Sequence, residues 1–104
     1  MKPVQTKKEL EERLHTHWEA IQHFGVKRLE IFGSFKKNMQ TEQSDVDFLV
    51  EFLPEKKTFR NFIGLALFLE DLLQRKVELI TPESLSPSLR STILSEVESV
   101  ETIP

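Results

Sequence analysis

The chain contains no cysteine and no long apolar run. Without cysteine it can form neither disulfides nor thiolate metal sites, and this absence suits a reducing compartment. The longest apolar run, residues 62–69, is far too short to span a bilayer. The lysines near the start are not followed by the apolar stretch of a signal peptide. We therefore expect a cytoplasmic protein that does not engage a membrane.

An excess of positive charge is also missing. The chain has 14 Lys and Arg against 17 Asp and Glu, so its formal net charge is -3. This balance gives no electrostatic case for a long polyanionic partner, and we expect no direct nucleic-acid binding. A length of 104 residues with 38% hydrophobic content allows one packed core. We therefore predict that residues 1–104 form a single domain.

Hydrophobic periodicity and capping residues predict alternating helices and strands. Thr6 and Thr58 fit helix N-caps, Gly25 fits a helix stop, and Pro87 fits a first helical turn. Residues 98–104 fit either a ragged tail or a short edge strand. The pattern predicts an α/β (α+β) fold of order α-β-α-β-α-β-α, with a small mixed sheet packed by helices. The expected helices lie near residues 7–23, 35–39, 59–73 and 87–97, and the expected strands near residues 26–32, 45–52 and 77–80.

Two of these helices are expected to bury an apolar face. The stripe along residues 59–73 has helical spacing and is predicted to be core. In the last helix the predicted buried face consists of Leu89, Ile93, Leu94 and Val97.

One constellation carries chemistry: Gly33-Ser34 at a strand end, ten intervening residues, then Asp45-Val46-Asp47. Residues i and i+2 of a strand share a face, so Asp45 and Asp47 present two carboxylates side by side. Two like charges that close repel each other unless a cation lies between them, and hard oxygen ligands suit Mg²⁺. A bare Asp-x-Asp also fits a turn cap followed by a solvated strand start. Gly33-Ser34 favours the site, because such a turn exposes amide groups to phosphate oxygens.

The segments IFGSF (residues 31–35) and SDVDFLVEF (residues 44–52) resemble the DNA polymerase beta superfamily of nucleotidyltransferases. The resemblance is to its minimal members, often paired with a HEPN-domain protein in toxin–antitoxin modules, and it covers nearly the whole chain. It implies a nucleotidyltransferase fold and a third acidic residue on the strand after the long helix, where Glu78 is the matching position. It further implies two Mg²⁺ or Mn²⁺ ions. The implied catalytic residues and metal ligands are Asp45, Asp47 and Glu78, and the implied nucleotide phosphate ligands are Gly33, Ser34 and Lys37.

Two departures from that family pattern bear on activity. Glu78 stands where relatives usually carry Asp, and Lys36-Lys37-Asn38 stands where they commonly carry Ala-Arg-Gly. A lysine supplies a point charge without the bidentate fork of arginine. Glu78 therefore has the alternative of a solvated edge position, and Lys36 and Lys37 have that of a solvated helix face.

The resemblance implies transfer of AMP from ATP to a hydroxyl, a Tyr on a cognate HEPN toxin, so that the protein acts as an antitoxin. A rival hypothesis is a catalytically weakened binding module that neutralises its partner by contact alone, and a third is a structural subunit of a larger transferase. The first two require a partner surface, in a homo- or hetero-oligomer. The apolar residues Val97, Val100 and Ile103 are expected to contribute to it.

Overall fold

The computed structural model describes residues 2–37, 39–96 and 98–99, and its elements follow the predicted alternation of helices and strands. Two 3₁₀ turns, Pro54–Lys56 and Pro82–Ser84, follow the second and third strands. The α/β prediction and its order are confirmed, with the first helix divided in two. The helices are α1 (Lys7–Thr16), α2 (Trp18–Gln22), α3 (Gly33–Lys36), α4 (Phe59–Leu73) and α5 (Pro87–Glu96), and the strands are β1 (Val26–Phe32), β2 (Val46–Phe52), β3 (Val77–Ile80) and β4 (Glu98–Ser99).

The four strands form one mixed sheet in the order β3-β2-β1-β4. β2 pairs antiparallel with β1 and parallel with β3, and α4 provides the crossover that a parallel connection needs. β4 pairs antiparallel with β1, so of the two alternatives for residues 98–104 the short edge strand is present at Glu98 and Ser99. The predicted partner-surface residues Val97, Val100 and Ile103 lie outside the described residues.

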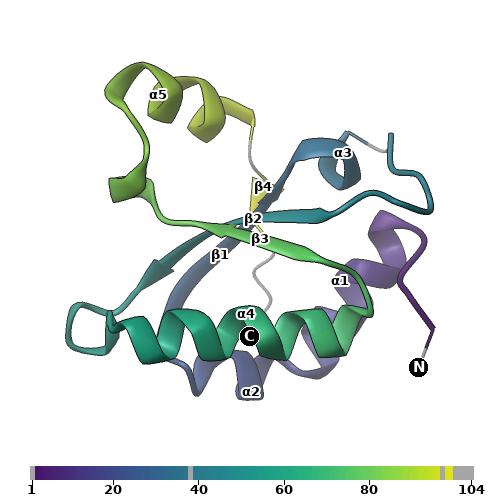
Figure 1. Cartoon of the computed structure of the whole chain (residues 1–104), viewed down its shortest axis with the longest axis horizontal. Helices are drawn as coiled ribbons and strands as arrows, with labels where there is room; N and C mark the ends of the chain where they lie inside the picture. Colours follow the sequence, from purple (N-terminus) through teal and green to yellow (C-terminus); the bar gives the residue numbers. More distant parts are fainter. Residues whose placement is uncertain (1, 38, 97, 100–104) are drawn as a thin grey trace.

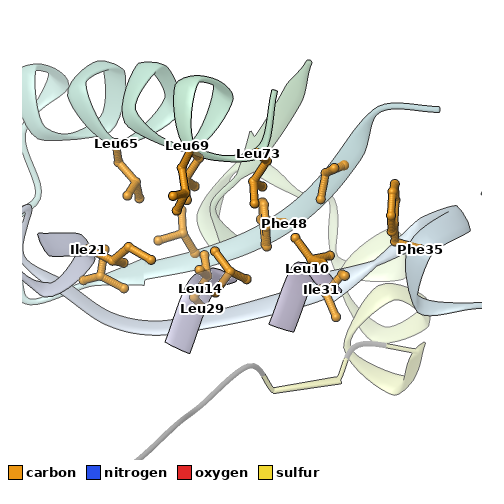
Figure 2. Close-up of a cluster of buried hydrophobic side chains, with 14 of the residues drawn as sticks. Leu10, Leu14, Ile21, Leu29, Ile31, Phe35, Phe48, Leu65, Leu69 and Leu73 are labelled. Atoms are coloured by element: carbon orange, nitrogen blue, oxygen red, sulfur yellow. The ribbon is translucent and has the colours of Figure 1, made fainter. Parts of the chain in front are cut away.

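The two faces of the sheet are covered differently. Helices α1, α2 and α4 lie against one face, whereas α3 and α5 lie on the opposite side (Figure 1). Figure 2 shows leucines of α4 pointing toward the strands, where they meet side chains of α1 and α2. The buried cluster on this face includes Leu10, Leu14, Ile21, Leu29, Ile31, Val46, Phe48, Val50, Leu65, Leu69 and Leu73.

Capping residues begin the two long helices where the sequence predicts. Thr6 Oγ1 accepts a hydrogen bond from the Glu9 amide, and Thr58 Oγ1 accepts one from the Asn61 amide, each at 3.1 Å. The prediction of one continuous helix over residues 7–23 is wrong. His17 Nδ1 lies 3.0 Å from the Arg13 carbonyl oxygen, the acceptor that the residue 17 amide would use in a continuing α-helix. That amide bonds to the Leu14 carbonyl instead, and α1 ends there.

Two predicted apolar faces are less buried than expected. In α5, Leu89 is 55% and Leu94 45% exposed, and Ile93 is half-buried. In α4, the predicted core stripe is wrong at Phe59 and Leu67, which are 80% and 62% exposed. Periodicity identifies the residues that share a helix face, but it does not show whether another element covers that face. In the described part of the chain, no helix has both the length and the hydropathy needed to traverse a membrane.

A carboxylate cluster beside a glycine turn

The first part of the site is the turn at the end of β1. Gly33 has φ +77°, a left-handed conformation that favours glycine, and the chain enters α3 there. The short helix predicted over residues 35–39 therefore begins two residues earlier and ends at Lys36, because Gly33 itself makes the turn. A Cβ atom built on Gly33 would overlap Oδ2 of Asp47. Glycine thus allows the backbone of the turn to lie directly against the Asp47 carboxylate.

The second part is a group of three carboxylates on neighbouring strands. Asp45 immediately precedes β2, and Asp47 lies within it, paired with Phe32 of β1 on one side and with Glu78 of β3 on the other. Paired residues of parallel strands project from the same face, so the register places Glu78 beside Asp47. Glu78 and Asp45 are exposed, whereas Asp47 is half-buried.

The three carboxylates are also coupled electrostatically. Partial burial, followed by the negative charges of Glu78 and Asp45, raises the pKa of Asp47 from 3.8 to about 6. The raised pKa means that placing a third negative charge here costs free energy in the absence of a cation. The same crowding makes the cluster a place where bound positive charge is favoured.

The donor set fits a hard divalent cation. All three groups offer carboxylate oxygens, and Mg²⁺ in proteins commonly takes one or two carboxylates together with waters and substrate phosphates. Within residues 2–37, 39–96 and 98–99, no three acidic or histidine side chains are placed so that they could hold one ion together. The arrangement therefore suits an ion that completes its coordination with waters and substrate oxygens.

The predicted phosphate ligands divide between two places. Gly33 and Ser34 lie in the turn against Asp47, whereas Lys37 lines a hollow of about 590 Å³ beside the start of α1. Four of the six residues that line this hollow are lysines. The lining residues are Thr6, Lys7, Lys8, Glu11, Lys36 and Lys37. No role was assigned to Lys7 and Lys8 from the sequence, so this basic surface was missed. The available signal was the pair of Lys-Lys dipeptides, at residues 7–8 and 36–37.

Comparison with known proteins identifies the family. Residues 7–100 match the family described as nucleotidyltransferase domain, so the chain belongs to that family and is a nucleotidyltransferase. It is 43% identical over 76 residues to a proposed protein adenylyltransferase of Methanocaldococcus jannaschii, covering 73% of this chain and 81% of that protein. It is 38% identical over 93 residues to the protein adenylyltransferase MntA of Thermococcus cleftensis, covering 88% of this chain and 93% of that protein.

Solved structures agree with this assignment. A proposed minimal nucleotidyltransferase superposes with a TM-score of 0.82 at 29% identity, covering 93% of this chain and 98% of the other. A chain of a toxin–antitoxin complex with AMP-PNP superposes with a TM-score of 0.68 at 19% identity, covering 89% and 73%. A chain of the complex between a tri-AMPylated Shewanella oneidensis HEPN toxin and MNT antitoxin gives 0.65 at 16% identity, covering 94% and 74%. The last two likenesses establish the fold alone.

Proposed function

We propose that this protein is an antitoxin that transfers AMP from ATP to a tyrosine hydroxyl of a cognate HEPN-type toxin, with divalent metal as cofactor. The observation that carries the proposal is the carboxylate cluster on β2 and β3, lying against the Gly33 turn. Two relatives named for protein adenylylation support the reaction class. A similarly folded chain in a complex with an AMPylated HEPN toxin supports the acceptor.

Each part of the site has a role in this proposal. Asp45 and Asp47 would hold Mg²⁺ or Mn²⁺, and Glu78 would complete the ligand set on the acceptor side. The metal, when bound, neutralises phosphate charge and lowers the pKa of the acceptor hydroxyl. The turn at Gly33 and Ser34 would receive the β and γ phosphates through backbone amides, which favour anions.

The bond changes are those of a phosphoryl substitution. The acceptor oxygen bonds to the α-phosphorus, the bond from that phosphorus to the bridging oxygen breaks, and pyrophosphate leaves. The hydroxyl proton passes to solvent. Lys37, in the basic hollow, would contribute positive charge toward the triphosphate. We also propose that residues 1–104 act as one nucleotidyltransferase domain, which the match over residues 7–100 supports.

The rival function, neutralisation of the partner by contact alone, draws on one observation. No three acidic or histidine groups among the described residues are positioned to hold one ion together. In a contact-only antitoxin the carboxylate cluster would be a remnant of an ancestral active site. The partner would then be inhibited without being modified. Partner binding occurs under both proposals, so nucleotide transfer must decide between them.

The test uses the complex with the product of the neighbouring gene, which the proposal predicts to be a HEPN-domain protein. The two proteins are co-expressed, purified together and incubated with ATP labelled at the α-phosphate and with Mg²⁺ or Mn²⁺. We expect label on the partner, located at tyrosine by mass spectrometry and lost when a chelator is added. The matched control is the complex containing Asp45→Asn with Asp47→Asn. A complex that forms and silences the toxin while the partner stays unlabelled would establish the contact-only function instead.

A further inference from the structure

Arg75 is the one charged residue with a buried side chain in the part of the chain that the structure describes, at 9% exposed. α4 ends at Leu73, and Gln74 adopts a left-handed conformation with φ 56° that turns the chain back toward the sheet. Burial of a charge is costly unless its donors are satisfied. The position therefore calls for specific partners.

Its guanidinium donates to three backbone carbonyls. Nε donates to the Val4 carbonyl at 2.6 Å, and Nη1 donates to the carbonyls of Thr41 at 2.9 Å and Ser44 at 2.8 Å. Thr41 and Ser44 are the ends of one turn, which is closed by the Ser44 amide on the Thr41 carbonyl at 3.1 Å and the Thr41 amide on Ser44 Oγ at 2.8 Å. Arg75 thus holds both ends of the turn that leads directly into Asp45.

The same guanidinium also reaches the other half of the site. Its central carbon lies 5.0 Å from the centre of the Phe35 ring, within range of a cation–π interaction. Phe35 is fully buried in α3 and follows Ser34 directly. One side chain therefore contacts the helix that carries the phosphate turn and the turn that carries the metal-binding carboxylates.

Neighbouring contacts fasten the same region. The Val46 amide donates to the Lys76 carbonyl at 2.9 Å, so the chain on both sides of Asp45 is fixed to the segment that begins β3. The Val4 amide donates to the Leu73 carbonyl at 3.1 Å. Val4 is therefore bonded both to the end of α4 and to Arg75. Arg75 lies at the centre of this arrangement, three residues before Glu78 on the same segment.

We infer that Arg75 is a positioning residue for the proposed transfer: it sets the Asp45–Asp47 carboxylates relative to the Gly33-Ser34 phosphate turn without touching substrate. The inference rests on the proposed function. Lysine cannot replace it, because an ammonium lacks both the planar fork that serves divergent carbonyls and the flat face that stacks on Phe35. Groups that orient metal ligands commonly change activity by about 10- to 100-fold when altered.

The experiment compares Arg75→Lys with wild type and with Ile21→Val, a mild core truncation on α2. Folded fraction is measured for each, and AMP transfer to the HEPN partner is expressed per folded molecule. Amide hydrogen exchange over residues 41–47 and calorimetric affinity for ATP with Mg²⁺ are measured on the full chain. We expect Arg75→Lys to lose about 10- to 100-fold in transfer and to exchange faster over residues 41–47. Ile21→Val should keep transfer per folded molecule within about twofold of wild type, because it removes one buried methyl group away from the site, and its exchange over residues 41–47 should rise less than that of Arg75→Lys.

Transfer by Arg75→Lys equal to that of Ile21→Val, or unchanged exchange over residues 41–47, would overturn the inference. If Arg75→Lys does not fold, Phe35→Leu is tested instead, because it removes the ring under the guanidinium. We expect a smaller decrease in AMP transfer and a smaller increase in exchange over residues 41–47. No change in either quantity would overturn the inference. A wild-type protein that transfers no AMP would refute the proposed function instead. The role of Arg75 would then be tested by hydrogen exchange over residues 41–47 and by the affinity for ATP with Mg²⁺, compared between wild type and Arg75→Lys.

Discussion

The two faces of strand β2 differ in almost every respect. On the face toward α1 and α4, the side chains of Val46, Phe48, Val50 and Phe52 are at most 6% exposed. On the opposite face, Asp47 and Glu51 are half-buried, and Leu49 between them is the apolar exception at 2% exposed. Alternation along one strand thus separates an apolar surface that stabilises the fold from an acidic surface on which chemistry can occur.

The difference between the two faces of β2 shows where this fold tolerates closely spaced negative charges. Partial burial, together with the negative charges of Glu78 and Asp45, raises the pKa of Asp47, so the ionised carboxylate costs stability. The apolar face, which packs against α1, α2 and α4, offsets this cost (Figure 1). If this division holds, substitutions on the acidic face should change function without unfolding the protein. Substitutions on the apolar face should do the reverse.

The largest expected effect is on the acidic face. Asp45→Asn with Asp47→Asn should abolish the joint binding of ATP and Mg²⁺ or Mn²⁺, because both anionic anchors are lost. Calorimetry on wild type and variant, with and without metal, measures this directly, and urea unfolding should show no loss of stability. Equal nucleotide affinity of the two proteins in the presence of metal would refute the metal-site assignment.

Next in size is an effect on the apolar face. Leu69 is fully buried in α4, and Leu69→Ala should lower the free energy of unfolding by about 2–5 kcal/mol, the usual range for a buried Leu truncation. Transfer per folded molecule should stay unchanged. Leu67→Ala is the matched control, because Leu67 lies on the same helix at 62% exposure and should cost less than about 0.5 kcal/mol. Similar losses at both positions in urea unfolding would show that α4 does not divide as described.

Glu78→Gln sharpens the comparison within the acidic face. The substitution keeps size and hydrogen bonding but removes the charge that lies beside Asp47 in the parallel register. Binding of ATP with metal should remain near normal, whereas AMP transfer should fall by about a hundredfold, the scale of a lost acid–base or metal contribution.

Glu51→Gln provides the control for Glu78, since Glu51 lies on the same face of β2 beyond Leu49. Its replacement should leave transfer within about twofold. Unchanged transfer by Glu78→Gln would remove Glu78 from the site and leave Asp45 and Asp47 in place.

Much of the fold could be predicted from the sequence, because capping residues, glycine and side-chain alternation specify local structure. Threonine caps at Thr6 and Thr58, the stop at Gly25 and the alternation of β2 all appear in the structure where sequence reasoning placed them. The sequence pattern grouped Gly33 and Asp47 in one site, and the structure brings them together because Phe32, at the end of β1, pairs with Asp47. These features depend on residues close in the sequence or on one strand pairing.

Other features depend on long-range contacts and were not predictable. The exposure of Leu89 and Leu94 follows from how little of α5 is covered, which no periodicity records. No role was assigned to Arg75 from the sequence, because its partners Val4 and Thr41 lie 71 and 34 residues away in the chain. A basic residue directly after a helix end gives no sequence signal of burial, because the left-handed turn at Gln74 decides its direction.

The smallest expected effect tests whether the acidic face costs stability. The pKa of Asp47 is raised in the folded protein from 3.8 to about 6, so between these values the folded state holds a proton more tightly than the unfolded chain. Stability therefore falls as the pH rises through this window, and above about pH 6 the charged carboxylate carries its full cost.

Asp47→Asn removes that charge and should be more stable than wild type at pH 7.5 in metal-free buffer. Because the group is half-exposed and screened by solvent, we expect a gain of about 1 kcal/mol or less. The gain should shrink as the pH is lowered toward 4, where wild-type Asp47 is itself protonated in the fold. Urea unfolding across this pH range measures it, with Asp71→Asn on the exposed side of α4 as the control that should show no such trend. A variant less stable than wild type at pH 7.5 would mean that the Asp47 carboxylate stabilises the fold. The acidic face of β2 would then not be a face that costs stability.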